Sequence, residues 1–355
     1  MIKEHALLPL FQKFVTDTRK GRRLNKNGNR IKPQTVINYS YCYKLLDDFA
    51  FDKTFNLIVY EIKGNNKREH NALKKYYGNF YKQFTSYMYN YKNCYDNYTG
   101  QNIKIIRTFF NWLNDVQGTH TGSFHKSFYI AKEDIAIVTL SVEQLQFFLF
   151  NEAFEAGLTL ALRRSKDVFV IGCLTGLRFS DICRLQVQNI EHRDGCTYIT
   201  TKSQKSNTGT MVKIPPQALN IIGKYVNNKA GLLPTVSLPQ FNKNIKKLGQ
   251  LAGWEYPIPL TGINKANGKQ RNISKNVTRK FYEALSSHTK RRTCITTMLT
   301  SGMPDYVVRK ISGHTSESKA FFRYVNLAQS LVDKEIDKMH IHFLKPATIN
   351  QTANS

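Results

Sequence analysis

Residues 175–181 read Thr-Gly-Leu-Arg-Phe-Ser-Asp, and they follow an apolar run over 168–174 that has the character of a buried helix. Gly176 permits a sharp turn where that helix ends, and the Ser-Asp pair can cap the next short helix. Arg178 is therefore expected to project from a rigid junction between two helices. An ordinary surface arginine that pairs with Asp181 is the alternative interpretation of the same residues.

A second segment, Ser287–Arg292, combines a histidine and an arginine on one helical face. His288 and Arg291 are three residues apart, and the face that they share continues as Ile295 and Leu299. A guanidinium fork and a histidine donor near a helix N-terminus form an anion site. A solvated basic face is the alternative interpretation.

Two segments near the C-terminus place a histidine and a tyrosine after predicted structure. Gly313 ends a helix predicted over Pro304–Ser312, so that His314 leaves a fixed turn. Farther on, a Phe-Phe pair anchors the segment that carries Tyr324. A capping histidine and plain core packing are the corresponding alternatives.

The net charge is far above what solubility requires. Among 355 residues, 52 are Lys or Arg and 25 are Asp or Glu, which gives a formal charge of +27 at pH 7. This excess indicates a polyanionic partner, and duplex DNA carries one charge per ~1.7 Å of axis. A membrane surface is the weaker choice because no basic amphipathic helix accompanies the charge. The basic stretches 19–32 and 265–292 are the candidate phosphate contacts.

The composition otherwise describes a folded protein of ordinary kind. Hydrophobic residues make up 41% and charged residues 22% of the chain, which excludes disordered, collagen-like and disulfide-stapled proteins. No apolar run is long enough to cross a bilayer, and no signal-peptide pattern opens the chain. The six cysteines show neither a CxxC pair nor zinc spacing. We therefore expect a cytoplasmic protein with reduced thiols, no metal ion and no cofactor.

The periodicity predicts a mainly α protein with a small antiparallel β-sheet. Helices are expected near 5–17, 71–90, 99–116 and 158–174, and Ser141 is expected to start another. Strands are expected at Cys196–Thr201 and Met211–Ile214, joined by a hairpin turn. We expect a helical domain over 1–118, a linker over 119–139, a mixed α/β domain over 140–345 and a polar tail over 346–355.

Taken in order, these segments resemble the pattern of the tyrosine recombinase, or phage integrase, family. That pattern is an arginine, a lysine on a hairpin, His-x-x-Arg, a histidine or tryptophan, and a nucleophilic tyrosine. Thr-Gly-Leu-Arg178 resembles the first element and His288-Thr-Lys-Arg291 the third, while Gly-His314 and Tyr324 resemble the last two.

The resemblance covers about 160–335, more loosely the N-terminal helices, and departs from the pattern at two points. His314 and Tyr324 lie ten residues apart, one more than the usual spacing, which implies a small loop adjustment. The hairpin lysine is ambiguous. Lys205 resembles the family's Lys-Thr or Lys-Gly turn and is the preferred candidate, but Lys202 lies three residues before it.

The resemblance implies that Tyr324 attacks a DNA phosphodiester, displaces a 5′-hydroxyl and becomes a 3′-phosphotyrosine. Arg178 and Arg291 would clamp the non-bridging oxygens, a charge that two guanidinium groups can neutralise without Mg²⁺. The new ester keeps the energy of the old one, so that no ATP is needed. The remaining implied roles are base or orienting group for His288, phosphate donor for His314 and general acid for Lys205.

The same resemblance implies a core-binding domain over 1–118, a two-domain clamp around duplex DNA, and a protein that is monomeric when free. Four protomers would assemble on two attachment sites, with a helix at Leu327–Met339 that docks on a neighbour or packs on its own domain. A DNA-bending accessory protein is a further expected partner. The sequence thus predicts the integrase or excisionase of a mobile element. Two alternatives stay open, a type IB topoisomerase-like enzyme and a catalytically inactive DNA-binding protein of this fold.

Overall fold

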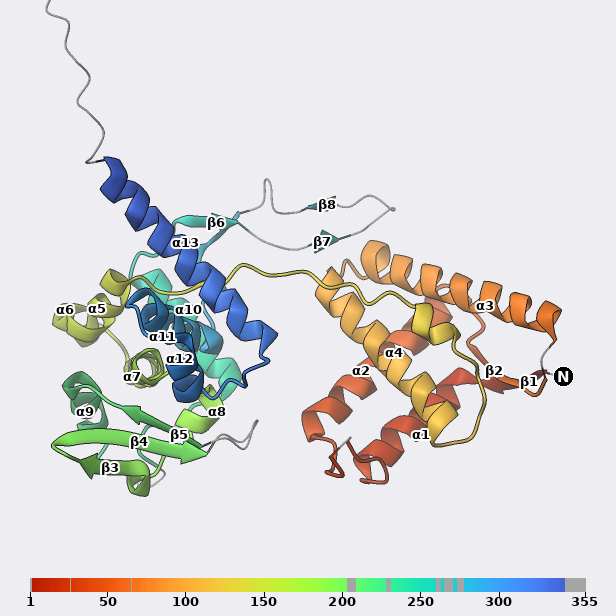
Figure 1. The fold of residues 1–355 in the computed structure, drawn as a ribbon, viewed down its shortest axis with the longest axis horizontal. Helices are drawn as coiled ribbons and strands as arrows, with labels where there is room; N and C mark the ends of the chain where they lie inside the picture. Colours follow the sequence, from red (N-terminus) through yellow and green to blue (C-terminus); the bar gives the residue numbers. More distant parts are fainter. Residues whose placement is uncertain are drawn as a thin grey trace, which may run out of the picture. The chain divides into compact units, whose positions relative to one another are not determined.

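The computed structural model describes residues 2–25, 27–64, 66–202, 209–227, 231–259, 263–264, 271–272 and 278–341. These residues form two compact units (Figure 1). One contains the residues up to Ile135 and the strand pair β7 (Ile263–Asn264) and β8 (Arg271–Asn272), and the other contains the remaining residues. Helices predominate and the sheets are small and antiparallel, which confirms the predicted fold class. Within the described ranges, no helix is both long and apolar enough to span a bilayer.

The first unit is a helical bundle with an aromatic core. Its helices are α1 (Leu7–Arg19), α2 (Pro33–Asp52), α3 (Lys67–Ser86) and α4 (Asp96–Asp115), with a π-helical turn at Tyr87–Tyr91 and a 3-10 turn at Phe124–Ser127. Each long helix turns one apolar stripe inward, as its periodicity predicts. The stripes meet in a core that includes Phe11, Phe14, Phe49, Phe80 and Phe109.

Two strands that the sequence pattern did not predict join this helical unit. They are β1 (Ile2–Ala6) and β2 (Ile58–Ile62), which pair antiparallel. Helix α3 also binds β2: the Ile58 amide donates to the Tyr76 hydroxyl at 2.8 Å, and the Tyr60 amide donates to the Tyr77 hydroxyl at 3.0 Å. Tyrosines of α3 thus hold the strand pair by satisfying backbone donors of β2.

The second unit is arranged around α7 (Leu160–Thr175). The other helices of this unit are α5 (Val142–Phe150), α6 (Glu152–Ala156), α8 (Phe179–Ile182), α9 (Pro216–Gly223), α10 (Leu238–Leu251), α11 (Ser287–Thr300), α12 (Asp305–Ser312) and α13 (Lys319–Ile341). Helix α7 is buried without interruption from Ser165 to Cys173 and packs against α5, α9, α10 and α11. A helix buried on all sides forms the centre of a core, so that the end of α7 is a well-fixed point in this unit.

A three-stranded sheet follows α8. Its strands are β3 (Ile190–Arg193), β4 (Cys196–Lys202) and β5 (Gly209–Lys213), in the order β3-β4-β5. The predicted strands correspond to β4 and β5, and their predicted hairpin pairing is confirmed by the antiparallel register. Strand β3 was not predicted. A second short pair, β6 (Pro257–Pro259) and β9 (Thr278–Lys280), precedes a 3-10 turn at Phe281–Ala284 that leads to α11.

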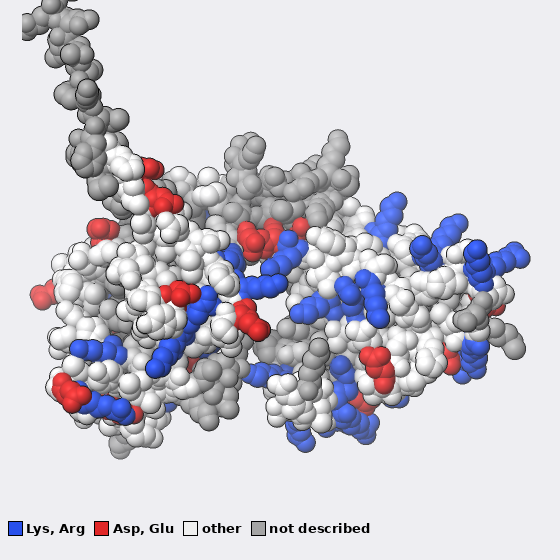
Figure 2. Space-filling view, viewed as in Figure 1, with Lys and Arg blue, Asp and Glu red and all other residues white. Residues whose placement is uncertain are grey.

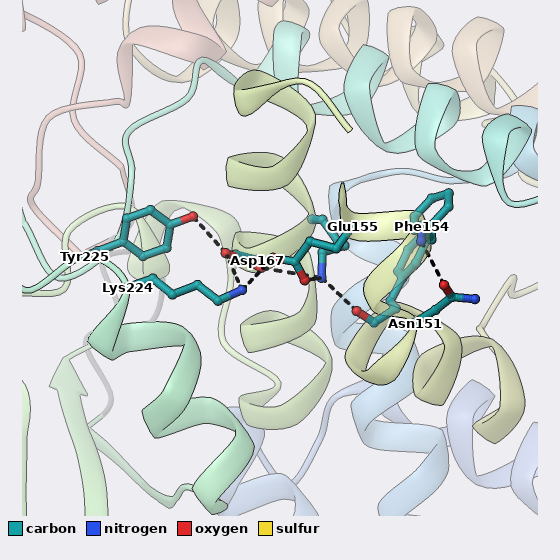
Figure 3. Close-up of polar contacts among 8 residues, drawn as sticks. Asn151, Phe154, Glu155, Asp167, Lys224 and Tyr225 are labelled. Atoms are coloured by element: carbon teal, nitrogen blue, oxygen red, sulfur yellow. Dashed lines mark hydrogen bonds and ion pairs between the residues drawn. The ribbon is translucent and has the colours of Figure 1, made fainter. Parts of the chain in front are cut away.

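A buried network of charges ties α7 to its neighbours (Figure 3). The Tyr225 hydroxyl donates to the Asp167 carboxylate at 2.8 Å, and the Lys224 amine lies 3.5 Å from the same carboxylate. The Glu155 carboxylate accepts from Lys224 at 2.7 Å and from Lys166 at 2.9 Å. Asp167 is 1% exposed and Lys166 is 2% exposed. Charges this deeply buried are tolerated only when they are paired, so the network depends on each of its members.

Replacing Asp167 by Ala is expected to lower the free energy of unfolding by about 3–5 kcal/mol. The change leaves the Tyr225 hydroxyl without its acceptor and the buried Lys166 amine with one carboxylate fewer. Urea titration measures the loss. Glu255→Ala is the control, because Glu255 pairs with Lys280 at 2.8 Å on the surface, where the two side chains are 47% and 50% exposed. That variant should lose at most about 1 kcal/mol, and equal losses in the two variants would refute the importance of the network.

Candidate active site

The junction between α7 and α8 has the turn that its sequence predicts. Helix α7 ends at Thr175, and Gly176 closes it with φ of 67°, a left-handed conformation that glycine adopts without strain. Arg178 follows as the N-cap residue of α8, and its side chain is half-buried. Since α7 is fixed in the core, Arg178 starts from a backbone position that α7 determines.

The polar residues after Arg178 do not have the predicted capping role. Ser180 and Asp181 lie inside α8, and no side chain caps the start of this helix. Asp181 is buried and pairs with Arg184 at 2.9 Å. The predicted cap is wrong because the turn is tighter than expected, which places α8 directly after Arg178.

Arg291 is buried, with 5% of its surface exposed. Helix α11 carries it inward, where Nη1 donates to the Gly176 carbonyl at 2.8 Å and Nη2 donates to the Ser312 carbonyl. Nη2 also lies 3.3 Å from Nδ1 of His314. One guanidinium therefore joins the turn after α7 to the turn after α12.

His314 leaves α12 through a left-handed glycine, as predicted, with φ of 62° at Gly313. Its Nδ1 lies 2.8 Å from the Ser312 hydroxyl and 3.3 Å from the guanidinium of Arg291. Nε2 lies 3.5 Å from the same guanidinium nitrogen, and the Ser312 hydroxyl donates its own proton to the Val308 carbonyl at 2.6 Å. Burial, and then the positive charges of nearby arginines led by Arg291, lower the pKa of His314 to about 3. The ring is therefore neutral at physiological pH and keeps one N–H as a donor.

Tyr324 lies on α13, next to the imidazole of His314, with 6.0 Å between the ring centroids. Phe321 anchors this part of α13, since it is 0% exposed and packs in a small core with residues of α11 and α12. Phe322 was predicted to act as a second anchor, but it is 52% exposed. The guanidinium of Arg309 lies 4.1 Å from the Phe321 ring centroid and 4.9 Å from that of Phe322.

Arg291, His314 and Tyr324 lie together, and Arg291 also holds the Gly176 carbonyl, two residues before Arg178. Burial, and then the positive charge of Arg178, lower the pKa of Arg291 to about 10, while Tyr324 acts in the opposite direction. Arg178 also contributes to the lowered pKa of His314. The two guanidinium groups disfavour one another, and an anion held between them would relieve that repulsion. The charges of this cluster would suit an anion, and the Tyr324 phenol lies beside the His314 ring.

The other predicted site residues are placed less completely. His288 lies exposed on the first turn of α11, three residues before Arg291. Lys205 lies outside the described residues. The backbone of Lys202 pairs with Gly209 at the end of β4, and its side chain lies outside the described part of the chain. The roles expected of these three residues stay predictions. Among the side chains that the structure describes, no group of His, Cys, Asp or Glu is arranged to hold a metal ion.

Two residues of the predicted phosphate-binding stretches are turned into the protein. Lys290 is 0% exposed, and its amine donates to the Leu177 carbonyl at 2.7 Å. The guanidinium of Arg23 lies 4.0 Å from the ring centroid of Phe14. The expectation that Lys290 contacts phosphate is therefore wrong.

The buried amine of Lys290 makes the free energy of unfolding rise with pH. Burial lowers the pKa of its amine to about 7; Cys173, Cys183 and Cys294 oppose this effect and Arg291 adds to it. Lysines of the unfolded chain titrate near ~10.4. Between these two values the unfolded chain binds a proton that the folded chain has released, so that folding becomes more favourable as the pH rises. Relative to Lys290→Met, the free energy of unfolding should rise by up to about 1.4 kcal/mol per pH unit between pH 7 and 9. Urea titrations at pH 7, 8 and 9 measure this difference, and a constant difference would contradict it.

Comparison with known proteins agrees with this geometry. Residues 159–330 match the Phage integrase family. Tyrosine recombinase XerA of Pyrococcus furiosus is 25% identical over 144 residues, which is 41% of this chain and 44% of that protein. The chain therefore matches less than half the length of this curated relative.

Solved structures share the fold at low sequence identity. A lambda integrase dimer bound to a COC′ core site has a TM-score of 0.57 at 12% identity, covering 91% of this chain and 78% of that one. XerH site-specific recombinase bound to a difH substrate, in a post-cleavage complex, has a TM-score of 0.55 at 13% identity, covering 90% and 80%. The Tn1549 transposon integrase has a TM-score of 0.54 at 14% identity, covering 90% and 95%. Residues 159–330, which carry the site, thus match the phage integrase family, and the chain shares its fold with these tyrosine recombinases.

Proposed function

We propose that this chain is a site-specific DNA recombinase, the integrase or excisionase of a mobile element. The observation that carries the proposal is that Arg291 contacts both His314 and the turn before Arg178, while Tyr324 lies beside His314. In the sequence, 146 positions separate Arg178 from Tyr324. Cationic and histidine donors that converge beside a potential nucleophile are the pattern by which an active site is identified.

The proposed reaction is transfer of a phosphoryl group to the phenol of Tyr324. The phenolic oxygen bonds to phosphorus, and the bond from phosphorus to the 5′-oxygen breaks. The phenolic proton passes to a base, for which His288 is proposed, and the departing 5′-oxygen takes a proton from Lys205. The 5′-hydroxyl of a partner strand then reverses the step. Because one ester replaces another, neither strand transfer requires an external energy source.

The charges of the site support this assignment. Two guanidinium groups can hold the non-bridging oxygens of the phosphate through paired hydrogen bonds. Arg291 is preorganised by the carbonyls of Gly176 and Ser312, so that little reorganisation accompanies the reaction. The neutral ring of His314 carries one N–H, which the proposal assigns to the phosphate.

Duplex DNA is the proposed substrate, and the surface charge supports it. In the first unit, exposed basic residues lie at the end of α1 (Arg19 and Lys20) and before the first turn of α2 (Arg30 and Lys32). Others lie exposed on α3: Lys67, Arg68, Lys74, Lys75 and Lys82. In Figure 2, Lys and Arg side chains lie along the region where Figure 1 places α3. Each phosphate neutralised by such a residue would contribute about −0.9 to the salt dependence of binding.

A tetramer on two synapsed sites, formed from free monomers, is the proposed assembly. The predicted docking segment, Leu327–Met339, is part of α13, and it exposes 36% of Leu331 and 40% of Ile336 while Ala328 is buried. Apolar side chains exposed on one helix support a contact with a neighbour. A DNA-bending accessory protein belongs to the same proposal. So does a cytoplasmic location, which is supported by the six cysteines, since all lie in the described residues as free thiols.

The test traps the covalent intermediate on a site selected from random sequence. A library of duplexes with a randomised centre and a nick a few nucleotides from it is incubated with the protein, so that cleavage releases a short strand and stops religation. Protein–DNA adducts that survive denaturing electrophoresis are recovered and sequenced. Enrichment of one sequence among them supports site-specific recombination. Adducts without sequence preference, with relaxation of any supercoiled plasmid, would indicate a topoisomerase instead. A protein that binds DNA but forms no adduct would leave only the inactive DNA-binding alternative.

A further inference from the structure

Two consecutive residues of α11 hold two consecutive carbonyls of the turn before Arg178. Arg291 donates to the Gly176 carbonyl at 2.8 Å, and Lys290 donates to the Leu177 carbonyl at 2.7 Å. The Leu177 carbonyl belongs to the peptide bond that joins Leu177 to Arg178. Leu177 is 3% exposed. The backbone from which the Arg178 side chain extends is thus held by both hydrogen bonds.

The interior of the unit is shaped to accept the Lys290 side chain. A Cβ placed on Gly172 would lie 2.2 Å from Cδ and 2.7 Å from Nζ of Lys290, so only a glycine at this position of α7 leaves room for it. An apolar side chain could fill the same volume without the cost of removing an amine from water. The need to fill space therefore does not explain why an amine lies here. The amine donates a hydrogen bond to the Leu177 carbonyl.

We infer that Lys290 is a positioning residue that acts through Arg178. It holds the Leu177 peptide so that the guanidinium of Arg178 meets the non-bridging oxygens of the scissile phosphate in productive geometry. This inference rests on the proposed function, because it assigns Arg178 to the phosphate. A misplacement of about 1 Å at a reacting group can cost about 10²-fold in rate, so the loss of this hydrogen bond should be visible in catalysis.

A double-mutant cycle tests the inference on the duplex selected in the trapping experiment. Single-turnover adduct formation is measured for the wild type, Lys290→Met, Arg178→Ala and the double variant. Lys290→Met should slow adduct formation about 10²-fold and leave the Kd for DNA within about threefold. In the Arg178→Ala background the same substitution should change the rate by less than about threefold, because the residue through which it acts is gone.

Two controls separate positioning from general weakening of the fold. Lys166→Met removes another buried amine of the same unit, which holds the Phe148 carbonyl at 2.8 Å and does not touch the turn. At matched folded fraction it should form the adduct at the wild-type rate. Gly172→Ala keeps the Lys290 amine but displaces its stem, and it should lower the rate with the same dependence on Arg178. If Lys290→Met fails to fold, Gly172→Ala tests the inference in its place.

The outcomes distinguish this inference from the proposed function. An undiminished rate in folded Lys290→Met or Gly172→Ala would overturn the inference, as would a full 10²-fold effect that persists without Arg178. Equal loss in Lys166→Met would reduce Lys290 to a structural residue. If the wild type itself forms no adduct with any duplex, the proposed function fails first.

Discussion

Replacing Tyr324 by Phe is expected to abolish the covalent protein–DNA adduct and to leave DNA binding within about twofold. The substitution removes one oxygen from a half-buried ring that stays packed beside His314 and Phe321, so the fold should be nearly unaffected. Without the phenolic oxygen no ester to phosphorus can form. Denaturing electrophoresis of the trapped complex measures the adduct, and a gel-shift titration measures binding.

Tyr306 provides the matched control for this experiment. It lies on α12 in the same small helical group, and it is 70% exposed. Tyr306→Phe should form the adduct at the wild-type rate. An adduct of undiminished yield in Tyr324→Phe would show that another residue is the nucleophile, and the proposed arrangement of the site would then be wrong.

Replacing Arg291 by Ala should damage both the reaction and the fold. Removal of one preorganised donor to the transferring phosphate lowers the rate by about 10²–10³-fold. The change also leaves the buried carbonyls of Gly176 and Ser312 without their donor, at a cost of about 1–3 kcal/mol each. Single-turnover adduct formation and urea titration measure the two effects separately.

Arg291→Lys discriminates between charge and geometry at this position. A lysine keeps the positive charge but cannot present the planar fork that reaches both carbonyls, so most of the loss should remain. Arg193→Ala is the control, because this arginine is 58% exposed at the end of β3 and pairs with Glu191 on the surface. A near-normal rate in Arg291→Lys would mean that the charge alone matters.

The turns of the site were predictable because they depend on local backbone geometry. Gly176 and Gly313 both adopt the left-handed conformation that ends a helix, which few other residues tolerate. The helix start at Ser141 was also predictable, since its side chain and that of Gln144 form reciprocal hydrogen bonds with the backbone. Such features need no information from distant residues.

Features that depend on distant partners were not predictable. Strands β1 and β2 pair over separations of 52 to 60 positions, from Ala6 with Ile58 to Ile2 with Ile62. A helix expected to start near His5 begins at Leu7. Lys290 was counted as a surface charge because composition does not tell which face of α11 turns inward. The docking segment and the tyrosine segment were treated as separate elements, although α13 carries both in one helix.

The pairing of Gly172 with Lys290 has a consequence for how this chain can diverge. A side chain at 172 and a long side chain at 290 compete for the same volume, so each excludes the other. If Gly172 is replaced by alanine first, the added methyl group clashes with the Lys290 side chain. If Lys290 is replaced by a shorter residue first, the change leaves a cavity instead of a clash. Drift at these two positions should therefore be ordered in time, with the loss of the lysine preceding the loss of the glycine.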